Sequence, residues 1–212
     1  MSAPDDLSLT ETGLAPCGTG RVLVIGCGAL AHEILALKRR HRWDHLDLTC
    51  LPAIWHNHPE RITPGVRDLV QKHRAAYDTI LVAYADCGTG GTLARACDAL
   101  GVTMIAGPHC YAFYDGLAGF ADRAEDEVTA FYLTDFLARQ FDAFVWRPLG
   151  LDRHPDLIEA YFGNYEKLVY LAQTDDPALD AQARTCATRL GLRYERRLTG
   201  YGDLAGFLAP GD

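Results

Sequence analysis

Three cysteines stand shortly after apolar runs that are rich in β-branched and aliphatic residues and are typical of buried strands. In a parallel sheet, ligands bind beyond the carboxyl ends of the strands. Adjacent strands lie about 4.8 Å apart, so thiols that follow three neighbouring strands can meet in one small site. In the common strand order 2-1-3-4-5, strands one, three and four are consecutive neighbours, and with this order assumed the positions of the cysteines predict such a site. The cysteines are Cys27 after residues 22–25, Cys87 after residues 80–85, and Cys110 after residues 102–106.

Thiolates are ligands of zinc and of iron–sulfur clusters, and a set of three leaves one coordination position open. The cysteines are 60 and 23 residues apart, unlike the close pairs of a zinc finger. We therefore expect Cys27, Cys87 and Cys110 to hold a [4Fe-4S] cluster, as first choice, or Zn²⁺. The open position would act as a Lewis acid on a small-molecule substrate in lyase, hydrolase or desulfuration-type chemistry. Nucleophilic or redox thiols and plain packing are the alternatives.

Proton-transfer groups are expected next to these cysteines. His109 immediately precedes Cys110, and an imidazole with an ordinary pKa near 6.5 suits proton transfer at neutral pH. Glu33 lies early in the helix expected after Cys27, and Asp86 immediately precedes Cys87. We predict catalytic roles for all three. A solvated surface position is the alternative for Glu33, and a structural hydrogen-bonding role is the alternative for Asp86.

Further residues near the strand ends are candidates for substrate binding. A His-x-His pair in the loop after the second strand can contact a ligand or order the loop. Glycines beside the cysteines let the backbone approach a bound group closely. An aromatic ring and a polar residue at later strand ends complete the set. The candidates are His56, His58, Gly28, Gly88, Gly90, Tyr111 and Gln173.

Two other functions are compatible with parts of the pattern. The segment 26–31 fits the dinucleotide fingerprint G-x-G-x-x-A, but the acidic residue that should end the second strand is missing, since Asp47 comes too early. Nucleotide binding is therefore disfavoured. A cofactor-independent enzyme of the racemase type is the stronger alternative, with Cys87 and a second cysteine as opposed acid and base.

The elements that must position these residues alternate between strand and helix, which predicts an α/β fold with a mainly parallel, doubly wound sheet and helices on both faces. We expect a flexible leader over residues 1–20 and a single domain over 21–212, with an aromatic-rich helical insertion that extends to Phe141. The expected strands are 21–25, 46–51, 80–84, 102–106, 144–146, 167–172 and 192–196, and the expected helices include 29–40, 62–76, 92–100 and 177–190.

Composition limits the possible partners and location. The chain has 212 residues, 49% of them hydrophobic, and a net charge of −8, which argues against nucleic-acid binding. No apolar run reaches the roughly 18 residues that span a bilayer, and residues 1–20 lack a secretory signal, so a cytoplasmic location is expected. Of the remaining cysteines, Cys50, Cys97 and Cys186 are expected to pack in the interior, and Cys17 to be incidental.

Several motifs over residues 21–208 carry a specific resemblance to a known family. They are Cys27-Gly28-Ala29-Leu30 with Glu33, Leu51-Pro52 with His56-Asn57 and Pro59, Asp86-Cys87-Gly88-Thr89-Gly90-Gly91, Gly107-Pro108-His109-Cys110-Tyr111, Phe131-Tyr132-Leu133-Thr134-Asp135-Phe136, and Gly163-Asn164-Tyr165. The chain resembles a family known only as a domain of unknown function. The resemblance implies no established reaction. Members occur near corrinoid-dependent methyltransferase systems for methylated amines, which implies one-carbon chemistry and a corrinoid or methyltransferase partner.

A non-catalytic carrier that delivers a metal or corrinoid to a methyltransferase is therefore a third alternative. A homodimer formed through an aromatic-rich surface helix is also expected.

Overall fold

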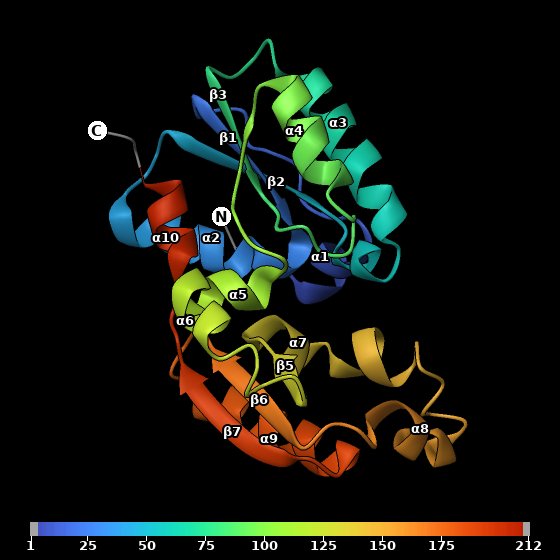
Figure 1. Cartoon of the computed structure of the whole chain (residues 1–212). Coiled ribbons are helices and arrows are strands. Elements are labelled where there is room, and N and C mark those ends of the chain that lie inside the picture. The colour runs from blue at the N-terminus through green and yellow to red at the C-terminus, as the bar shows by residue number, and fades with distance from the viewer. Residues whose placement is uncertain (1–3, 210–212) are drawn as a thin grey trace. The chain divides into compact units, whose positions relative to one another are not determined.

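The strands of the protein pair in parallel, as expected for the α/β class, but they form two sheets rather than one. The computed structural model describes residues 4–209. The chain divides into unit 1, Met1–Phe113 with Asp203–Asp212, and unit 2, Tyr114–Gly202 (Figure 1). Each unit has its own sheet, whereas the sequence was interpreted as one domain over residues 21–212.

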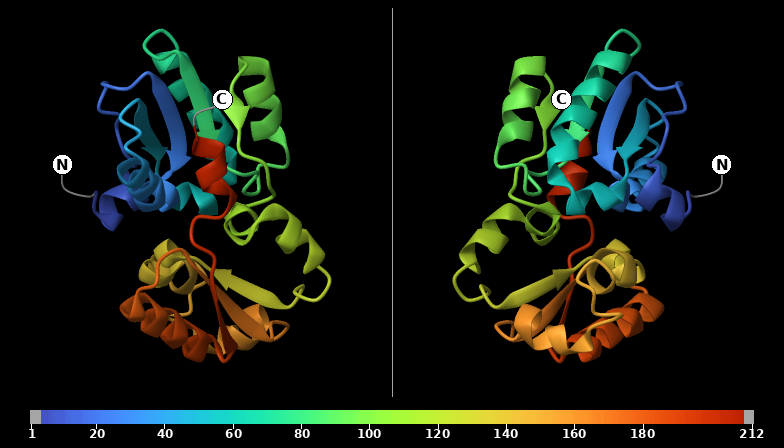
Figure 2. Two further views of the ribbon diagram at one scale, coloured as in Figure 1. Left: turned by 90° about the vertical axis from the view of Figure 1, so that its left-hand side faces the viewer. Right: turned by 90° about the vertical axis from the view of Figure 1, so that its right-hand side faces the viewer.

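Unit 1 is built on a four-stranded sheet in the order β2-β1-β3-β4, which is the neighbour relation on which the three-cysteine prediction depends. Helices α3 and α4 pack side by side, and helix α2 contacts β2 (Figures 1 and 2). Helix α4 ends at Gly101, which takes the left-handed conformation predicted for a C-terminal glycine. The elements are β1 Val22–Cys27, α2 Ala31–His41, β2 Leu46–Leu51, α3 Ile62–His73, β3 Thr79–Ala83, α4 Thr92–Leu100, β4 Thr103–Met104, α10 Asp203–Leu208 and α5 Cys110–Asp115, within which the division between the units falls.

The segment before β1 is structured, although a flexible leader was expected for residues 1–20. Helix α1 covers Asp6–Glu11 and begins with Asp5, whose side chain accepts a hydrogen bond from the Ser8 amide. Leu9 is completely buried, and Leu14 makes an antiparallel bridge with Cys50 of β2. The difference arises because the segment is ordered by tertiary contacts, which its polar composition does not reveal. Residues 1–3 lie outside the described part of the chain.

Unit 2 contains the three-stranded sheet β5-β6-β7. Leu168, Tyr170 and Ala172 of β6 alternate along one face, where they share a hydrophobic core with Ala183 and Ala187 of α9. The elements are α6 Leu117–Asp122, β5 Ala130–Leu133, α7 Asp135–Arg139, α8 Ile158–Phe162, β6 Lys167–Ala172, α9 Pro177–Leu190 and β7 Arg193–Leu198.

Two local assignments in unit 2 differ from expectation. Ala130–Leu133 forms strand β5 inside the segment predicted to be mostly helical, because four residues are too few to show a strand period. The expected strand 144–146 is instead the end of a single π-helical turn, Asp142–Trp146. Its apolar residues face the core from a helix, and periodicity alone does not separate that case from a short buried strand.

Short 3₁₀ segments complete the fold: η1 Gly28–Leu30, η2 Ala53–Asn57, η3 Pro59–Arg61 and η5 Pro155–Leu157. In the part of the chain that the structure describes, no helix combines the length and apolar character that crossing a bilayer requires.

Candidate functional site

Four neighbouring strands of unit 1 each place one reactive side chain at the same edge of the sheet. Cys27 is the last residue of β1, and Cys87 and Cys110 follow β3 and β4. His56 lies in η2, directly after β2. Because the four strands are parallel and adjacent, their carboxyl ends meet at one edge. The structure thus brings the three predicted cysteines to one end of the sheet.

The closest contact in this group joins Cys27 and His56. Cys27 Sγ lies 3.4 Å from His56 Nδ1 and accepts a hydrogen bond from the Ala29 amide, also at 3.4 Å. Burial disfavours a thiolate at Cys27, but the charge and hydrogen bond of His56 outweigh it and lower the pKa of Cys27. The thiolate in turn raises the pKa of His56 against the effect of burial. The geometry therefore favours a thiolate–imidazolium pair.

Cys87 is joined to the third cysteine by the backbone. The amides of Asp86 and Cys87 donate to the carbonyls of Gly107 and Pro108, at 3.1 and 2.9 Å, and so tie the loop after β3 to the loop after β4. Cys87 has a φ of +47°, in the left-handed region that non-glycine residues rarely occupy. Burial, followed by the charge of the nearby Cys87 and Cys27 side chains, raises the pKa of Cys110. The three sulfurs are therefore close enough to interact electrostatically.

Asp86 holds the loop that carries Cys87. Its carboxylate accepts hydrogen bonds from the Thr89 hydroxyl at 2.8 Å and from the amides of Gly91 and Gly90 at 2.7 and 3.1 Å. Although partial burial opposes it, these bonds lower the pKa of Asp86. All three contacts lie within one turn, with Gly88 and Gly90 at positive φ. This arrangement matches the structural alternative for Asp86 and gives the two glycines a role in loop shape.

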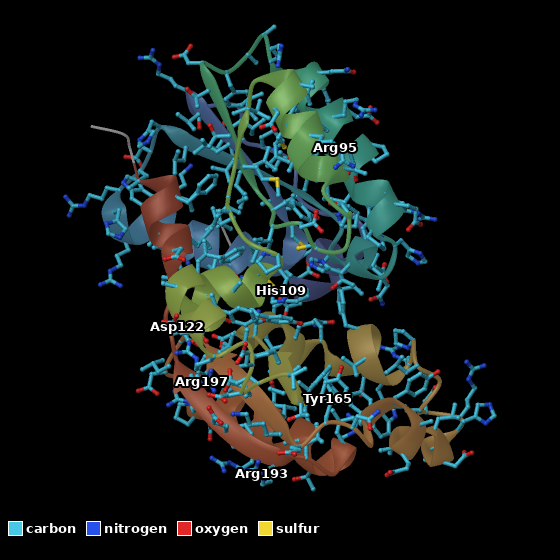
Figure 3. The ribbon with its side chains drawn as sticks, in the orientation of Figure 1. Arg95, His109, Asp122, Tyr165, Arg193 and Arg197 are labelled. Atoms are coloured by element: carbon cyan, nitrogen blue, oxygen red, sulfur yellow. The ribbon has the colours of Figure 1, made fainter. Side chains whose placement is uncertain are left out.

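Glu33 and His109 lie near the cysteines but in different surroundings. Glu33 is buried on α2 rather than solvated, and it contributes, after burial and Cys27, to a raised pKa of Cys50 on β2. His109 is partly buried directly before α5 (Figure 3). Its ring centroid is 5.1 Å from that of Tyr111. Burial lowers the pKa of His109, so that its imidazole is neutral at pH 7.

Three predicted substrate-binding residues are engaged elsewhere. His58 is exposed and lies 3.7 Å from a Glu60 carboxylate oxygen. Gly28 is pressed against α1, where a Cβ atom would lie 2.1 Å from the Leu9 carbonyl oxygen. Gln173 belongs to unit 2, and its amide accepts from the Asp135 backbone at 2.7 Å and donates to the Leu171 carbonyl at 2.6 Å.

Tyr84 belongs to the site although the sequence analysis did not select it. It follows β3 directly and is 1% exposed, and its ring stacks on that of His56 with centroids 6.4 Å apart. Burial, with the nearby Cys27 and Cys87, raises the pKa of Tyr84, so its phenol stays protonated. The sequence places Tyr84 inside the expected strand 80–84, whereas β3 ends at Ala83, and this one-residue difference puts Tyr84 at the strand end.

The thiols as placed do not form a preorganised metal cage. Within residues 4–209, no group of three His, Cys, Asp or Glu side chains is arranged so that it could hold a metal ion. Ligation by all three cysteines would therefore require side chains to rotate from the positions seen.

The fold and the site define an α/β protein with a cysteine–histidine cluster at the carboxyl ends of a parallel sheet. Residues 50–208 match the family model described as a protein of unknown function, DUF1638, and the chain belongs to this family. The expected resemblance to a family of unknown function is thereby confirmed. The match includes His56, Cys87 and Cys110, whereas Cys27 precedes it. Comparison with curated proteins gives no match, and neither does comparison with solved structures.

Proposed function

We propose that the protein is a metalloenzyme in which Cys27, Cys87 and Cys110 hold a [4Fe-4S] cluster or Zn²⁺. The observation that carries the proposal is the convergence of these thiols, with His56, from four adjacent parallel strands on one edge of the sheet. Cysteines that serve only as packing have no reason to occupy equivalent strand ends. Cys97 and Cys186, by comparison, are buried within helices α4 and α9.

The chemistry of the donors suits such a group. Metal ligation requires the thiolate form, and the pKa of Cys27 is already lowered beside His56. His56 also interacts with Cys87, so the imidazole can take up or release the protons that accompany ligation. When bound, the metal group would supply Lewis-acid chemistry toward a small substrate.

The chain's own groups would then manage protons and exclude water. The neutral imidazole of His109, beside Tyr111, can accept a proton at the rim of the site. Glu33, buried on α2 near Cys50, is the second proton-transfer candidate. Asp86 instead fixes the Cys87 loop through its three hydrogen bonds.

Three finer expectations belong to the same proposal: a cytoplasmic location, a corrinoid-dependent methyltransferase system as the biological partner, and a homodimer. The partner rests on the family resemblance, and the other two rest on the sequence.

The test is anaerobic purification of the full chain, followed by analysis of iron, acid-labile sulfide and zinc and by an absorption spectrum. We expect a bound metal in a constant ratio to protein, and loss of most of it in each of the variants Cys27→Ala, Cys87→Ala and Cys110→Ala. Cys97→Ala and Cys186→Ala are the matched controls, because both are buried cysteines outside the site. Protein free of all three elements, with unchanged cysteine variants, would refute the proposal.

A second function is favoured by the Cys27–His56 contact at 3.4 Å. A thiolate stabilised by an imidazolium can abstract a proton without a metal, while the Cys110 thiol, whose pKa is raised, can return one. Because Cys27 is buried, the test is the ultraviolet absorbance of the thiolate rather than alkylation. This thiol acid–base enzyme predicts thiolate absorbance at pH 7 in metal-free protein, which His56→Gln should lower and a chelator should not. Absence of thiolate absorbance, or absorbance that His56→Gln leaves unchanged, would exclude it.

A further inference from the structure

Unit 1 contains a pocket between the N-terminal segment and the α2–β2 face, and none of the cysteine-site residues lines it. Its volume is about 820 Å³, within the range of small-molecule sites. Leu14 of the N-terminal segment, Leu35 of α2 and Leu48 of β2 contribute apolar lining. None of Cys27, His56, Cys87 or Cys110 lines it, so any ligand here is independent of the proposed metal site.

Several charges in this pocket are already used within the protein. Lys38 Nζ lies 3.9 Å from Asp47 Oδ1 and also donates to the Leu46 carbonyl. Asp47 Oδ2 accepts from the Thr19 and Gly20 amides and from the Tyr77 hydroxyl. The lining carboxylate of Asp5 caps α1 through Ser8. Lys38 and Asp47 are therefore paired with each other, and the Asp5 carboxylate is engaged at the start of α1.

Two guanidinium groups that line the same pocket are not paired in this way. Arg39 and Arg42 line the pocket at the end of α2, and both residues are exposed. Across residues 4–209 neither guanidinium makes an ion pair through its side chain. Of the lining carboxylates, Asp5 and Asp44 also make no ion pair within the described residues, and Asp5 accepts hydrogen bonds from Ser8. Two unpaired guanidinium groups therefore line the pocket beside its apolar interior.

The backbone at Arg42 is unusual for the residue it carries. Arg42 ends α2 with a φ of +55°, a position that glycine commonly fills. With Cys87, it is one of two non-glycine residues at positive φ within residues 4–209. Arg42 thus lines the pocket from a backbone conformation that glycine would adopt without strain.

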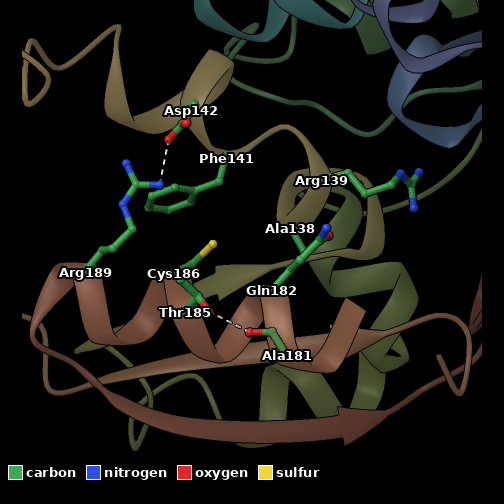
Figure 4. Close-up of a pocket in the computed structure, with 9 residues that line it drawn as sticks. All are labelled: Ala138, Arg139, Phe141, Asp142, Ala181, Gln182, Thr185, Cys186 and Arg189. Carbon is green, nitrogen blue, oxygen red and sulfur yellow. Dashed lines mark hydrogen bonds and ion pairs between the residues drawn. The ribbon is translucent and has the colours of Figure 1, made fainter. Parts of the chain in front are cut away.

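The pocket on unit 2 between α7 and α9 shows the contrasting case (Figure 4). Its volume is about 340 Å³. There Arg189 is paired with Asp142 at 2.7 Å and lies 4.0 Å from the centre of the Trp146 ring. Its guanidinium is therefore committed to the fold, unlike those of Arg39 and Arg42.

We infer that the pocket of unit 1 binds a small organic acid, with its carboxylate at Arg39 and Arg42 and an aliphatic or aromatic body against the leucines. Guanidinium groups match a carboxylate in geometry and charge. The apolar lining excludes a bare inorganic anion as the preferred ligand, since it would leave the leucine surface in water.

The probe is octanoate, added to the full chain and measured by titration calorimetry. Uncharged 1-octanol and cationic octylamine, which share its apolar body, are the comparisons. Exposed Cys17 lines the pocket and reports occupancy through its rate of alkylation by neutral iodoacetamide, followed by peptide mass spectrometry. We expect octanoate to bind and to slow the alkylation of Cys17. We also expect it to bind at least about tenfold more tightly than either comparison.

The double substitution Arg39→Gln and Arg42→Gln should weaken octanoate binding by about tenfold or more, without affecting folding because both residues are exposed. The control is Arg40→Gln, an exposed arginine of the same helix that does not line the pocket. Equal binding of octanol would show that the pocket binds the apolar chain alone and would overturn the inference. So would equal weakening by Arg40→Gln, or no binding of octanoate.

Discussion

Replacing Gly28 by alanine separates a structural role from a ligand-binding one at the end of β1. The added Cβ atom would lie 2.1 Å from the Leu9 carbonyl oxygen and 3.2 Å from the Ala53 amide nitrogen. Both are backbone atoms, so no side chain can rotate away. Helix α1 would have to move by more than about 1 Å to restore ordinary contact distances.

The expected cost follows from what α1 buries. Leu9 has no exposed surface, and full burial of a leucine side chain contributes about 1.5–3 kcal/mol. Overpacking costs about 1–3 kcal/mol when the neighbours must shift. Gly28→Ala should therefore lower the free energy of unfolding by about 2–4 kcal/mol. For a chain of this size, that corresponds to a fall of roughly 5–15 °C in the midpoint of thermal unfolding.

The assay is thermal and denaturant unfolding of Gly28→Ala, Leu9→Ala and the double variant. If Gly28→Ala acts by displacing α1, Leu9→Ala should add little to it, because the leucine contacts are already weakened. The control is Gly206→Ala in α10, where an added Cβ meets no atom within 4 Å and stability should stay the same or rise slightly. Additive losses, or an unchanged midpoint for Gly28→Ala, would refute the reasoning.

Three other substitutions test hydrogen-bonded carboxylates. Burial opposes ionisation of Asp47, but hydrogen bonds from two amides and a phenol lower its pKa. The ionised carboxylate therefore stabilises the fold above the unfolded-state pKa of about 4, and this stabilisation is lost as the pH falls through the lower pKa of the folded state. Asp47→Asn should cost about 2–3 kcal/mol at pH 7 and flatten the acid limb of the stability–pH curve, measured by urea unfolding. Glu127→Gln should destabilise unit 2 by about 1–3 kcal/mol, because Lys167 and Arg197 lose one of the carboxylates that pair with them and keep Glu195; a stability equal to wild type in thermal unfolding would contradict this. Asp86→Ala should speed amide hydrogen exchange at Gly90 and Gly91 by about tenfold, and unchanged protection would show that the loop holds itself.

The first sheet and the positions of the cysteines could be predicted from the sequence because apolar runs and glycines mark the strand ends. The strand predicted at 46–51 coincides with β2, and the predicted neighbour relation of β1, β3 and β4 is observed. Once strand order is known, the strand-end rule places Cys27, Cys87 and Cys110 together without knowledge of any side-chain contact.

The parts that escaped prediction depend on contacts between distant residues. The Cys27–His56 pair joins positions 29 residues apart, and no local pattern assigns an imidazole to a particular thiol. Gln173 follows a strand as expected, but that strand belongs to the second sheet, and the boundary between the sheets has no composition signal. Gly28 is predicted to bind substrate because it follows a cysteine in the sequence, whereas in the structure it lies against Leu9.

The bridge between Leu14 and Cys50 has a consequence for self-association. Strand β2 is the outer strand of the first sheet, and an outer strand left open can recruit a strand of another molecule. The residues ahead of β1 occupy part of that side, with the Leu14 and Cys50 amides and carbonyls exchanging hydrogen bonds at 2.9–3.0 Å. A chain trimmed to begin at Arg21 would uncover it. Such a chain should aggregate at concentrations at which the full chain stays dispersed, even if its cysteine edge is intact.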